Sequence, residues 1–532
     1  MTAKVVERLQ AWMPRHAGVA ALCLLALVLR LPGLTESLWY DELWSTRVIL
    51  GSVGDFLRLA LSDVHPPLYG AIAFLWTRLF GDSELAIRAL PMLAGIATIA
   101  LMPALGAVLA TRGAGWVAGV LLALSPVHIW YSQEARAYAL IMLLAVLLVL
   151  QWHHLDEGAS RRVRAFWFVI TSIALSQLHY FAIAIPAALA VVALMQRRNR
   201  GTSLLALGLS VTGIAALLAV KSTVGALTLE TGYLRAFDAD AATYLFKEWF
   251  PLGGSVALTP DETPIARTVG WSFFAIATAS LLVWLFAGWR FLQRERWLEH
   301  AMMIAAVPGL LVVLAIIGRD NYYIERSALA SLPFYFLAVA AGLWLIRNDS
   351  VRRVAVVATV LSSVAILGHY YQRRDGWTVY KPNPDWRAII PPLLEARGTP
   401  ARPLVVFSAM PLTELLYYAP DAEECLWPAP SESLERPRVP GIRGAVARLF
   451  PRSERLTCGP NGTASIRIYT APDSGSAWVE AIRVHEYDAR PLVILQDDWM
   501  GRTRAVMRSL SSTGHTVQSV ARSRGIEVFA ID

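Results

Sequence analysis

The chain has 532 residues, of which 56% are hydrophobic and 17% charged, and its mean hydropathy is +0.47. Soluble domains are about 45–50% apolar and about 25% charged, so this composition excludes an ordinary soluble enzyme, a disordered chain and a collagen-like chain. The net charge of +8 does not indicate nucleic-acid binding. Arginine and lysine occupy short loops between apolar runs, and no nucleic-acid-binding motif is present.

The long apolar runs lie almost entirely within residues 17–371. A transmembrane helix needs about 20 apolar residues. The sequence therefore predicts an α-helical polytopic membrane domain over residues 1–371 and a soluble α/β domain over residues 372–532. About eleven spans are predicted, at 16–34, 88–110, 114–131, 135–152, 163–178, 180–196, 202–220, 268–289, 299–317, 327–346 and 353–371.

Two apolar runs, Ala17–Leu29 and Phe166–Met195, need their flanking residues to be interpreted. Basic residues precede the run Ala17–Leu29, but no small-residue cleavage site follows it, which indicates an uncleaved first helix. The run Phe166–Met195 is long for one helix and short for two. Two helices that turn at Ser176–Tyr180 leave the arginine clusters at both of its ends on one side of the membrane.

With eleven spans the positive-inside rule predicts a cytoplasmic N-terminus and an outer C-terminal domain. The outer loops are then residues 35–87, 131–138, 221–267 and 318–326. An Arg- and Ala-rich composition suggests a bacterium, so the predicted location is the cytoplasmic (inner) membrane with a periplasmic or extracellular tail.

Three cysteines are too few for a disulfide framework. Cys425 and Cys458 either pair or remain thiols.

The tail shows a mixture of strand and helix patterns. Pro391 and Pro392 are expected to begin or interrupt a helix. Strands are predicted at Leu404–Ser408, Ile466–Thr470 and Leu492–Gln496, with a closing hairpin of Thr516–Ala521 and Ile526–Ile531. Helices are predicted at Thr413–Tyr418, Ala477–Val484 and Arg502–Leu510.

The first outer loop carries adjacent carboxylates, Asp41 and Glu42, among the aromatic residues Trp39, Tyr40 and Trp44. Adjacent carboxylates that are partly shielded from water acquire different pKa values, which suits general acid/base catalysis. The alternative is a solvated loop with an aromatic belt at the membrane interface. The spacing alone supports both interpretations equally.

The next candidate residues are Asp63 and His65, which precede Pro66 and Pro67. The prolines begin the apolar segment Leu68–Phe80, which is too short to span a membrane and is predicted to lie in the interface as an amphipathic helix. His65 and the nearby carboxylates are of the types that bind a divalent metal. A lone histidine is more often a helix cap or a structural hydrogen-bonding residue.

Two further outer segments carry ionisable residues at the ends of spans. Glu134 and Arg136 lie in one turn, and Arg319, Tyr322 and Arg326 precede the tenth span. Ionisable groups at this depth are often functional, and guanidinium groups match phosphate oxygens. The alternatives are an interfacial Glu–Arg pair and ordinary helix anchoring. No P-loop, GxGxxG, HExxH or GxSxG motif is present, so no nucleotide site is predicted.

The order of these motifs resembles a known family. The motifs are Leu38-Trp-Tyr-Asp-Glu-Leu43, His65-Pro-Pro-Leu-Tyr69, Arg88, Tyr131-Ser-Gln-Glu-Ala-Arg-Ala-Tyr138, and Arg326 followed by Leu332–Gly342. Together they resemble the bacterial glycosyltransferase family 39 relatives, which are type C membrane glycosyltransferases akin to protein O-mannosyltransferases and the lipid A aminoarabinose transferase. The resemblance covers about residues 20–345, and Asn383–Arg387 is also similar to many bacterial members.

The resemblance implies an inverting enzyme that moves one sugar from a polyprenyl phosphate to a lipid, glycan or protein hydroxyl. It implies Asp41 as the base that deprotonates the acceptor, with Glu42 as the alternative or as a partner that positions the acceptor. It also implies Glu134 as a second acidic position. It further implies substrate binding by basic and tyrosine residues on the outer side. These residues are His65, Tyr69, Arg136, Tyr138, Tyr322 and Arg326.

One residue departs from the family pattern. Aminoarabinose transferases carry a lysine before the Pro-Pro pair, where this chain has His65, which argues against an aminoarabinose donor. Family members differ in metal use, so a divalent metal stays open and none is assigned. Three other function classes remain: a transporter or flippase for lipid-linked glycans, an oligosaccharide ligase or polymerase, and a non-catalytic membrane scaffold with a binding tail. The absence of a repeated half and the nearly charge-free span centres disfavour a transporter.

Overall fold

The computed structural model describes most of the helical part of the chain and selected segments of the tail. The described ranges are 3–63, 65–156, 160–223, 264–317, 325–372, 384–397, 404–407, 466–469, 492–496, 516–523 and 526–531, together with Leu415 and Tyr418. The predictions for Arg319, Tyr322, Cys425, Cys458 and the helices at Ala477–Val484 and Arg502–Leu510 lie outside these residues. The same is true of most of the predicted helix at Thr413–Tyr418 and of the loop 221–267.

Contacts within the chain define two compact units. The first contains Met1–Leu34 and Arg58–Gln372, and the second contains Thr35–Leu57 and Arg373–Asp532. Part of the first predicted outer loop is therefore grouped with the tail. The predicted domain boundary after residue 371 stays a prediction.

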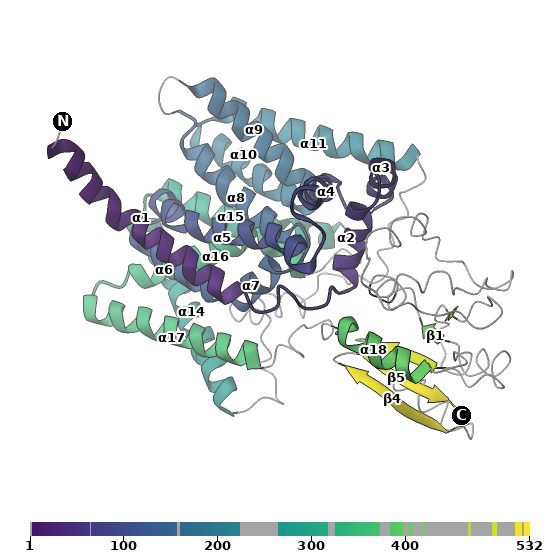
Figure 1. Ribbon diagram of the computed structural model, residues 1–532. Helices are drawn as coiled ribbons and strands as arrows, with labels where there is room; N and C mark the ends of the chain where they lie inside the picture. The colour runs from purple at the N-terminus through teal and green to yellow at the C-terminus, as the bar shows by residue number, and fades with distance from the viewer. Residues whose placement is uncertain are drawn as a thin grey trace. The chain divides into compact units, whose positions relative to one another are not determined.

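The first unit is built from helices packed against one another (Figure 1). They are α1 (Ala3–Arg30), α4 (Leu68–Phe80), α5 (Glu84–Leu109), α6 (Arg112–Leu124), α7 (Pro126–Ser132), α8 (Tyr138–His153), α9 (Arg161–Leu178), η1 (Tyr180–Ile183), α10 (Ala184–Gln196), α11 (Arg200–Thr223), α14 (Pro264–Phe291), α15 (Arg294–Ile316), η4 (Glu325–Ser331), α16 (Leu332–Trp344) and α17 (Asp349–Gln372). Helix α3 (Val53–Ser62) connects the two units along the chain.

A helix lies within each of the eleven predicted spans, but fewer are long and apolar enough to cross a membrane. Six described helices meet that requirement, or up to seven if α6 and α7 form one span. These two helices bend by 67° because Ser125 caps α7 and Pro126 begins it. The chain is a multi-pass membrane protein, and the predicted count of eleven spans is not confirmed.

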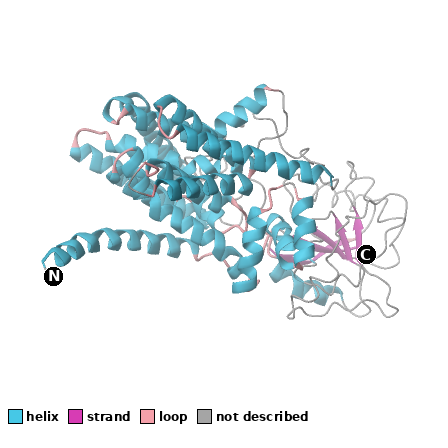
Figure 2. Ribbon diagram, turned by 90° about the horizontal axis from the view of Figure 1, so that it is seen from above, coloured by secondary structure: helices cyan, strands magenta, loops and turns pink. Residues whose placement is uncertain are grey.

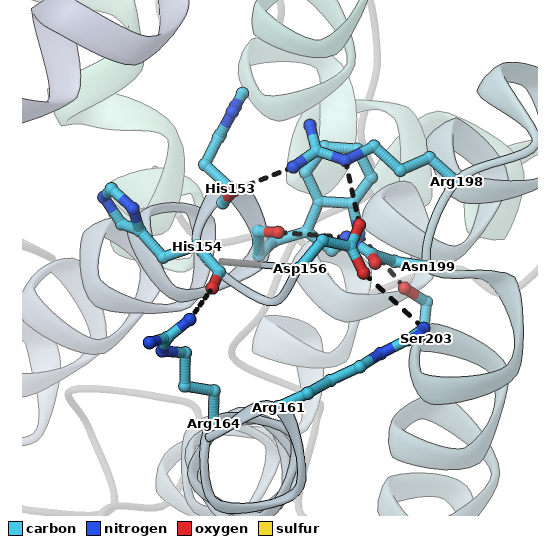
Figure 3. A network of polar contacts seen from close by, with 9 residues as sticks. His153, His154, Asp156, Arg161, Arg164, Arg198, Asn199 and Ser203 are labelled. Atoms are coloured by element: carbon cyan, nitrogen blue, oxygen red, sulfur yellow. Dashed lines mark hydrogen bonds and ion pairs between the residues drawn. The ribbon is translucent and has the colours of Figure 1, made fainter. Parts of the chain in front are cut away.

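The predicted break at Ser176–Tyr180 is confirmed: α9 ends at Leu178, and η1 and α10 follow. Helices α9, α10 and α11 lie side by side (Figure 1). Figure 3 shows that arginines from both clusters reach the same carboxylate. Arg161 Nη2 lies 3.5 Å from Asp156 Oδ1, and Arg198 Nε donates to Asp156 Oδ2 at 3.4 Å. The two arginine clusters therefore lie at one end of the helix bundle.

The same network satisfies carbonyl groups at the C-terminal end of α8 (Figure 3). The Asn199 amide donates to the Trp152 carbonyl at 3.1 Å, and Arg198 Nη2 donates to the His153 carbonyl at 2.8 Å. Arg164 Nη1 donates to the His154 carbonyl at 3.2 Å. The last carbonyls of a helix lack intrahelical partners and favour cations. Some arginines that indicate topology in the sequence thus also cap a helix.

Small residues allow close helix contacts in this unit. A Cβ atom added to Gly106 of α5 would lie 2.4 Å from the Gly115 Cα atom of α6. A Cβ atom added to Gly342 of α16 would lie 1.8 Å from the Ser280 carbonyl oxygen of α14. Backbones approach closely through small residues in membrane helix bundles, where van der Waals packing is a main driving force for association.

Gly342→Ala is expected to destabilise the protein because the new methyl group overlaps the α14 backbone and forces the helices apart. Overpacking of this kind costs about 1–3 kcal/mol or more. Thermal unfolding of the detergent-solubilised protein should show a lower Tm. Gly309→Ala is the matched control, since a Cβ atom there meets nothing within 4 Å. Equal Tm values for the two variants would contradict the described α14–α16 contact.

The second unit contains all the described strands (Figure 2). They are β1 (Leu404–Phe407), β2 (Ile466–Tyr469), β3 (Leu492–Gln496), β4 (Val517–Ser523) and β5 (Ile526–Ile531), in the sheet order β2-β1-β3-β5-β4. Strand β1 is parallel to β2 and β3, whereas β5 is antiparallel to β3 and β4. The predicted strands and closing hairpin are confirmed, and the α/β class of the whole tail stays a prediction.

Two helices complete the described part of this unit, α2 (Tyr40–Leu50) and α18 (Trp386–Arg397). Helix α18 packs on β4 and β5 (Figure 1). The prediction that Pro391 and Pro392 begin or interrupt a helix is wrong, because α18 runs through both. The prolines lack N–H donors, which weakens the helix. Burial of Trp386, Ile389 and Leu393 offsets this loss.

Candidate active site

His65 and Arg136, which are far apart in the sequence, are hydrogen-bonded in the first unit. Arg136 Nη2 donates to His65 Nε2 at 2.7 Å, so this imidazole nitrogen accepts and carries no proton. Arg136 lies in the turn between α7 and α8 and is 8% exposed. The bond orients a buried guanidinium, the group that best matches the geometry of phosphate oxygens.

The backbone around His65 is held by Lys221 at the end of α11. Lys221 Nζ donates to the His65 carbonyl at 2.8 Å and also to the Asp63 carbonyl. The His65 N–H donates to Asp63 Oδ1 at 2.8 Å. Lys221 is a buried residue, and its role in this arrangement is to fix the segment that carries His65. Its signal in the sequence is a single lysine that ends an apolar run.

No sequence motif marks His179, yet the structure places it beside His65. The two ring centroids lie 5.7 Å apart, and the Tyr138 ring centroid is 6.4 Å from that of His179. The Phe181 N–H donates to His179 Nδ1 at 3.2 Å, which leaves the proton of the neutral ring on Nε2. Burial lowers the pKa of His179 to about 3, with further lowering from His65, Arg136 and Arg326. His179 is therefore a neutral N–H donor at ordinary pH.

Arg326 and the tyrosines of the α7–α8 region extend this cluster. Arg326 Cζ lies 5.8 Å from the centroid of the Tyr138 ring, within cation–π range. Tyr138 packs edge-on against Tyr131, with their centroids 5.1 Å apart. Tyr138 is buried, and Tyr69 is buried on α4. The structure thus brings together His65, Arg136, Tyr138 and Arg326 of the predicted residues, with His179 in addition.

Glu134 lies in the same turn as Arg136 and is 3% exposed. The Arg136 N–H donates to the Glu134 carbonyl at 2.7 Å. The turn is tied to the end of α1, because the Gln133 side-chain amide donates to the Arg30 carbonyl at 2.6 Å. Arg88 donates to the Gly33 carbonyl at 3.0 Å. Motif residues without a predicted chemical role therefore hold the segment that leads into the first outer loop.

Asp41 and Glu42 lie in the first turn of α2, in the second unit. Glu42 Oε2 accepts a hydrogen bond from the Trp39 N–H at 3.2 Å, and Glu42 is 1% exposed. This backward bond is half of a capping box and gives Glu42 a structural role at the start of the helix. Asp41 is only half-buried. The choice of Asp41 over Glu42 as the base stays a prediction.

No three His, Cys, Asp or Glu side chains come together as metal ligands within the described ranges. The first unit instead brings together cationic and neutral hydrogen-bond donors from four separate segments. This arrangement can bind an anion with several oxygen atoms, and it can stabilise negative charge that develops on such a group. Among the predicted substrate-binding residues, Tyr322 lies outside the described residues.

The low pKa of His179 predicts a contribution to acid sensitivity. Below pH 6.5 the unfolded state takes up a proton that the folded state binds only near pH 3, so stability falls as the pH falls from 6.5 towards 3. The Tm of the wild type should therefore fall more between pH 7.5 and pH 5 than the Tm of His179→Gln. His154→Gln, at an exposed position, is the control. Equal losses in all three proteins would contradict a neutral, enclosed His179.

Several solved structures are similar to this chain at low sequence identity. ArnT from Cupriavidus metallidurans bound to undecaprenyl phosphate is 14% identical, with a TM-score of 0.49 over 96% of this chain and 97% of that chain. An Archaeoglobus fulgidus oligosaccharyltransferase tethered with an acceptor peptide is 12% identical, with a TM-score of 0.45 over 76% and 62% of the two chains. The arabinofuranosyltransferase AftD from Mycobacteria is 15% identical, with a TM-score of 0.42 over 97% and 40%.

No curated protein sequence matches the chain significantly. A family model does match, over residues 64–224, and it is described as dolichyl-phosphate-mannose-protein mannosyltransferase. This stretch contains His65, Tyr69, Arg88, the Tyr131–Tyr138 motif and His179. The resemblance of the chain to the glycosyltransferase family 39 relatives, predicted from its motifs, is therefore confirmed.

Proposed function

We propose that the protein is an inverting glycosyltransferase that moves a single sugar from a polyprenyl phosphate to a lipid, glycan or protein hydroxyl. The reaction takes place on the outer face of the cytoplasmic membrane. The observation that carries the proposal is that two arginines and two histidines lie together, namely Arg136, Arg326, His65 and His179. All except Arg326 belong to the segment that matches the mannosyltransferase family model, and Arg326 lies against Tyr138 of that segment. Two fixed cations and two imidazoles suit a phosphate that is covalently linked to a lipid.

In this proposal the acceptor hydroxyl oxygen attacks the anomeric carbon of the donor sugar, and Asp41 takes up the hydroxyl proton. The bond between the anomeric carbon and the phosphate oxygen breaks, and its electron pair leaves with the polyprenyl phosphate. Arg136 and Arg326 stabilise the negative charge that develops on this leaving group. A single displacement inverts the anomeric centre. Glu134 supplies the second acidic position of the site, and Tyr69 and Tyr138 line the donor groove.

His65 stands where aminoarabinose transferases carry a lysine, and its contacts suggest a different use of this position. Its Nε2 atom accepts from Arg136, and Lys221 supports its backbone. We assign the direct phosphate contact to Arg136 and a supporting role to His65. The cation that the family places at this position is thereby supplied from the Tyr131–Tyr138 motif. This assignment does not favour an aminoarabinose donor over other sugars.

The test is mass spectrometry of envelope glycolipids and glycoproteins from a deletion strain that carries the wild-type gene, the Asp41→Asn variant or no gene. We expect one single-sugar mass difference that the wild type restores and the variant does not. This mass identifies both the sugar and the acceptor. Loss of a whole glycan would instead indicate a ligase or polymerase. Accumulation of an unchanged lipid-linked sugar on the cytoplasmic face would indicate a flippase.

A further inference from the structure

The start of α18 binds the first part of the segment that contains α2, within the second unit. Ser37 Oγ donates to Asp385 Oδ1 at 2.9 Å, and the Arg387 N–H donates to Ser37 Oγ at 3.1 Å. Arg387 Nη1 also donates to the Thr35 carbonyl at 3.1 Å. We call these contacts of Thr35 and Ser37 with Asp385 and Arg387 the loop clasp. They join residues that are about 350 positions apart in the sequence.

Asp385 is fixed in place by contacts on both sides. The same Oδ1 atom that accepts from Ser37 also accepts from the Ala388 N–H at 3.2 Å, as an N-cap of α18 does. The Asp385 carbonyl accepts from Ser523 Oγ of β4 at 2.9 Å. Asp385 therefore links three things: the first turn of α18, the edge of the sheet, and Ser37. A side chain held in this way presents its carboxylate to Ser37 in one orientation.

The Ser37 end of the loop clasp is shielded from water, whereas the bond between Arg387 and the Thr35 carbonyl is exposed. Ser37 is 2% exposed and Leu38 is fully buried. The Leu38 N–H donates to the Tyr418 hydroxyl at 2.7 Å, so the next residue is also held by the tail. Breaking a buried hydrogen bond from one side leaves the other group unsatisfied, which costs more than an exposed bond of the same geometry. Moving the segment away from this position therefore costs free energy.

The loop clasp ends where α2 begins. Trp39 is the N-cap of α2, and Asp41 and Glu42 lie in its first turn. Only Trp39 and Tyr40 separate Leu38 from Asp41, so the direction in which α2 starts is set by the clasped residues before it. We propose that Asp385 is a positioning residue for the transfer reaction, which holds the first turn of α2, and with it Asp41, through Ser37. The proposal rests on the proposed function in naming Asp41 as the base.

This proposal gives the tail a defined contribution to catalysis without substrate contact. A base that is displaced by about 1 Å can lose roughly 100-fold in rate. The competing explanation is that Asp385 only caps α18 and stabilises the tail. The two explanations differ in what they predict for residues 38–43: loss of the link to α2 speeds their amide exchange and lowers kcat, whereas loss of α18 capping alone changes neither.

Two variants break the link from opposite sides. Asp385→Ser keeps an N-cap residue on α18 but is too short to keep the Ser37 bond. Ser37→Ala removes the same bond and also the acceptor of the Arg387 N–H, while Asp385 still caps α18 through the Ala388 N–H. We expect each to lower kcat about 10- to 100-fold, with the KM for the donor changed less than about threefold. The double variant should lose little more than either single variant, because both remove one interaction. Asp385→Asn retains an acceptor oxygen and should restore most of the activity.

Hydrogen exchange measured by mass spectrometry on the full chain in lipid nanodiscs gives a readout that needs no activity. Amides of residues 38–43 should exchange about tenfold faster in Asp385→Ser and Ser37→Ala than in the wild type, at a temperature where all proteins are folded. Glu395→Gln, at an exposed position on the same helix, is the matched control and should leave both exchange and kcat unchanged. Faster exchange together with reduced kcat supports the proposal.

Unchanged exchange of residues 38–43 in both variants would overturn the proposal, whatever the activity. Faster exchange with wild-type kcat would also overturn it, because the clasp would then hold α2 without effect on the reaction. A wild-type protein that transfers no sugar from any polyprenyl phosphate would refute the proposed function, and with it the catalytic part of this inference. The exchange measurement would still decide whether the clasp orders α2.

Discussion

Asp41→Asn is expected to lower kcat for sugar transfer by about 10²- to 10⁴-fold, the usual contribution of a general base. An asparagine side chain has nearly the same shape, so folding should be unaffected while the ability to accept the acceptor proton is lost. The measurement is sugar transfer by purified protein in nanodiscs, with a radiolabelled polyprenyl-phosphate sugar and an envelope extract as acceptor. Donor binding should remain within about threefold of the wild type.

Glu42→Gln is the matched control for this prediction. Glu42 Oε2 accepts from the Trp39 N–H, and a glutamine oxygen can accept the same bond. We therefore expect less than a tenfold change in kcat and an unchanged Tm, whereas Glu42→Ala should lower the Tm by removing the cap. If Glu42→Gln is inactive and Asp41→Asn is active, the assignment of the base is reversed.

Arg136→Met should reduce kcat/KM by about 10²- to 10³-fold, which is about 3–4 kcal/mol of transition-state stabilisation. The reason is that the variant removes the buried guanidinium to which we assign the contact with the leaving phosphate, and the His65 Nε2 atom loses its partner. Arg136→Lys should recover only part of the activity, because an ammonium group cannot form the bidentate bonds of a guanidinium. Binding of a short-chain polyprenyl monophosphate, measured by calorimetry, should weaken in parallel.

Arg353→Met is the control for the loss of one positive charge, since Arg353 is exposed near the start of α17. It should leave both activity and binding unchanged. Normal binding of the polyprenyl monophosphate by Arg136→Met would exclude Arg136 from the phosphate site and leave Arg326 as the main candidate. A loss of folded protein in Arg136→Met but not in Arg136→Lys would indicate a mainly structural role.

Much of the helical framework could be predicted from local sequence signals. Charge at both ends of residues 163–196 predicts two helices, and the structure divides them at His179. Alternating and apolar runs predict the tail strands. The predicted span count is not confirmed because helices such as α8 and α10 are apolar but short. Burial among neighbours rather than length makes these helices stable. Pro391 and Pro392 failed as helix boundaries because packing of α18 on the sheet outweighs local propensity.

The candidate site was predictable only where a motif carried it. His65, Arg136 and Arg326 stand in motifs, but their association depends on the packing of segments that are distant in the sequence. His179 and Lys221 have no motif, and each joins the site through the end of a helix whose position is set by the whole first unit. The bond between Ser37 and Asp385 spans 348 positions, and no local pattern predicts such a pairing.

The grouping of Thr35–Leu57 with Arg373–Asp532 has a consequence for engineering and for evolution. A chimera that receives the tail of a relative at residue 373 would separate Asp385 from the Ser37 with which it is paired. Such a graft should misfold locally or lose activity, even if both parent proteins are active. A graft that also exchanges residues 35–57 keeps both halves of the discontinuous unit from one parent. The two segments are therefore expected to change together as the tail diverges, so that recombination succeeds only when both are inherited from the same ancestor.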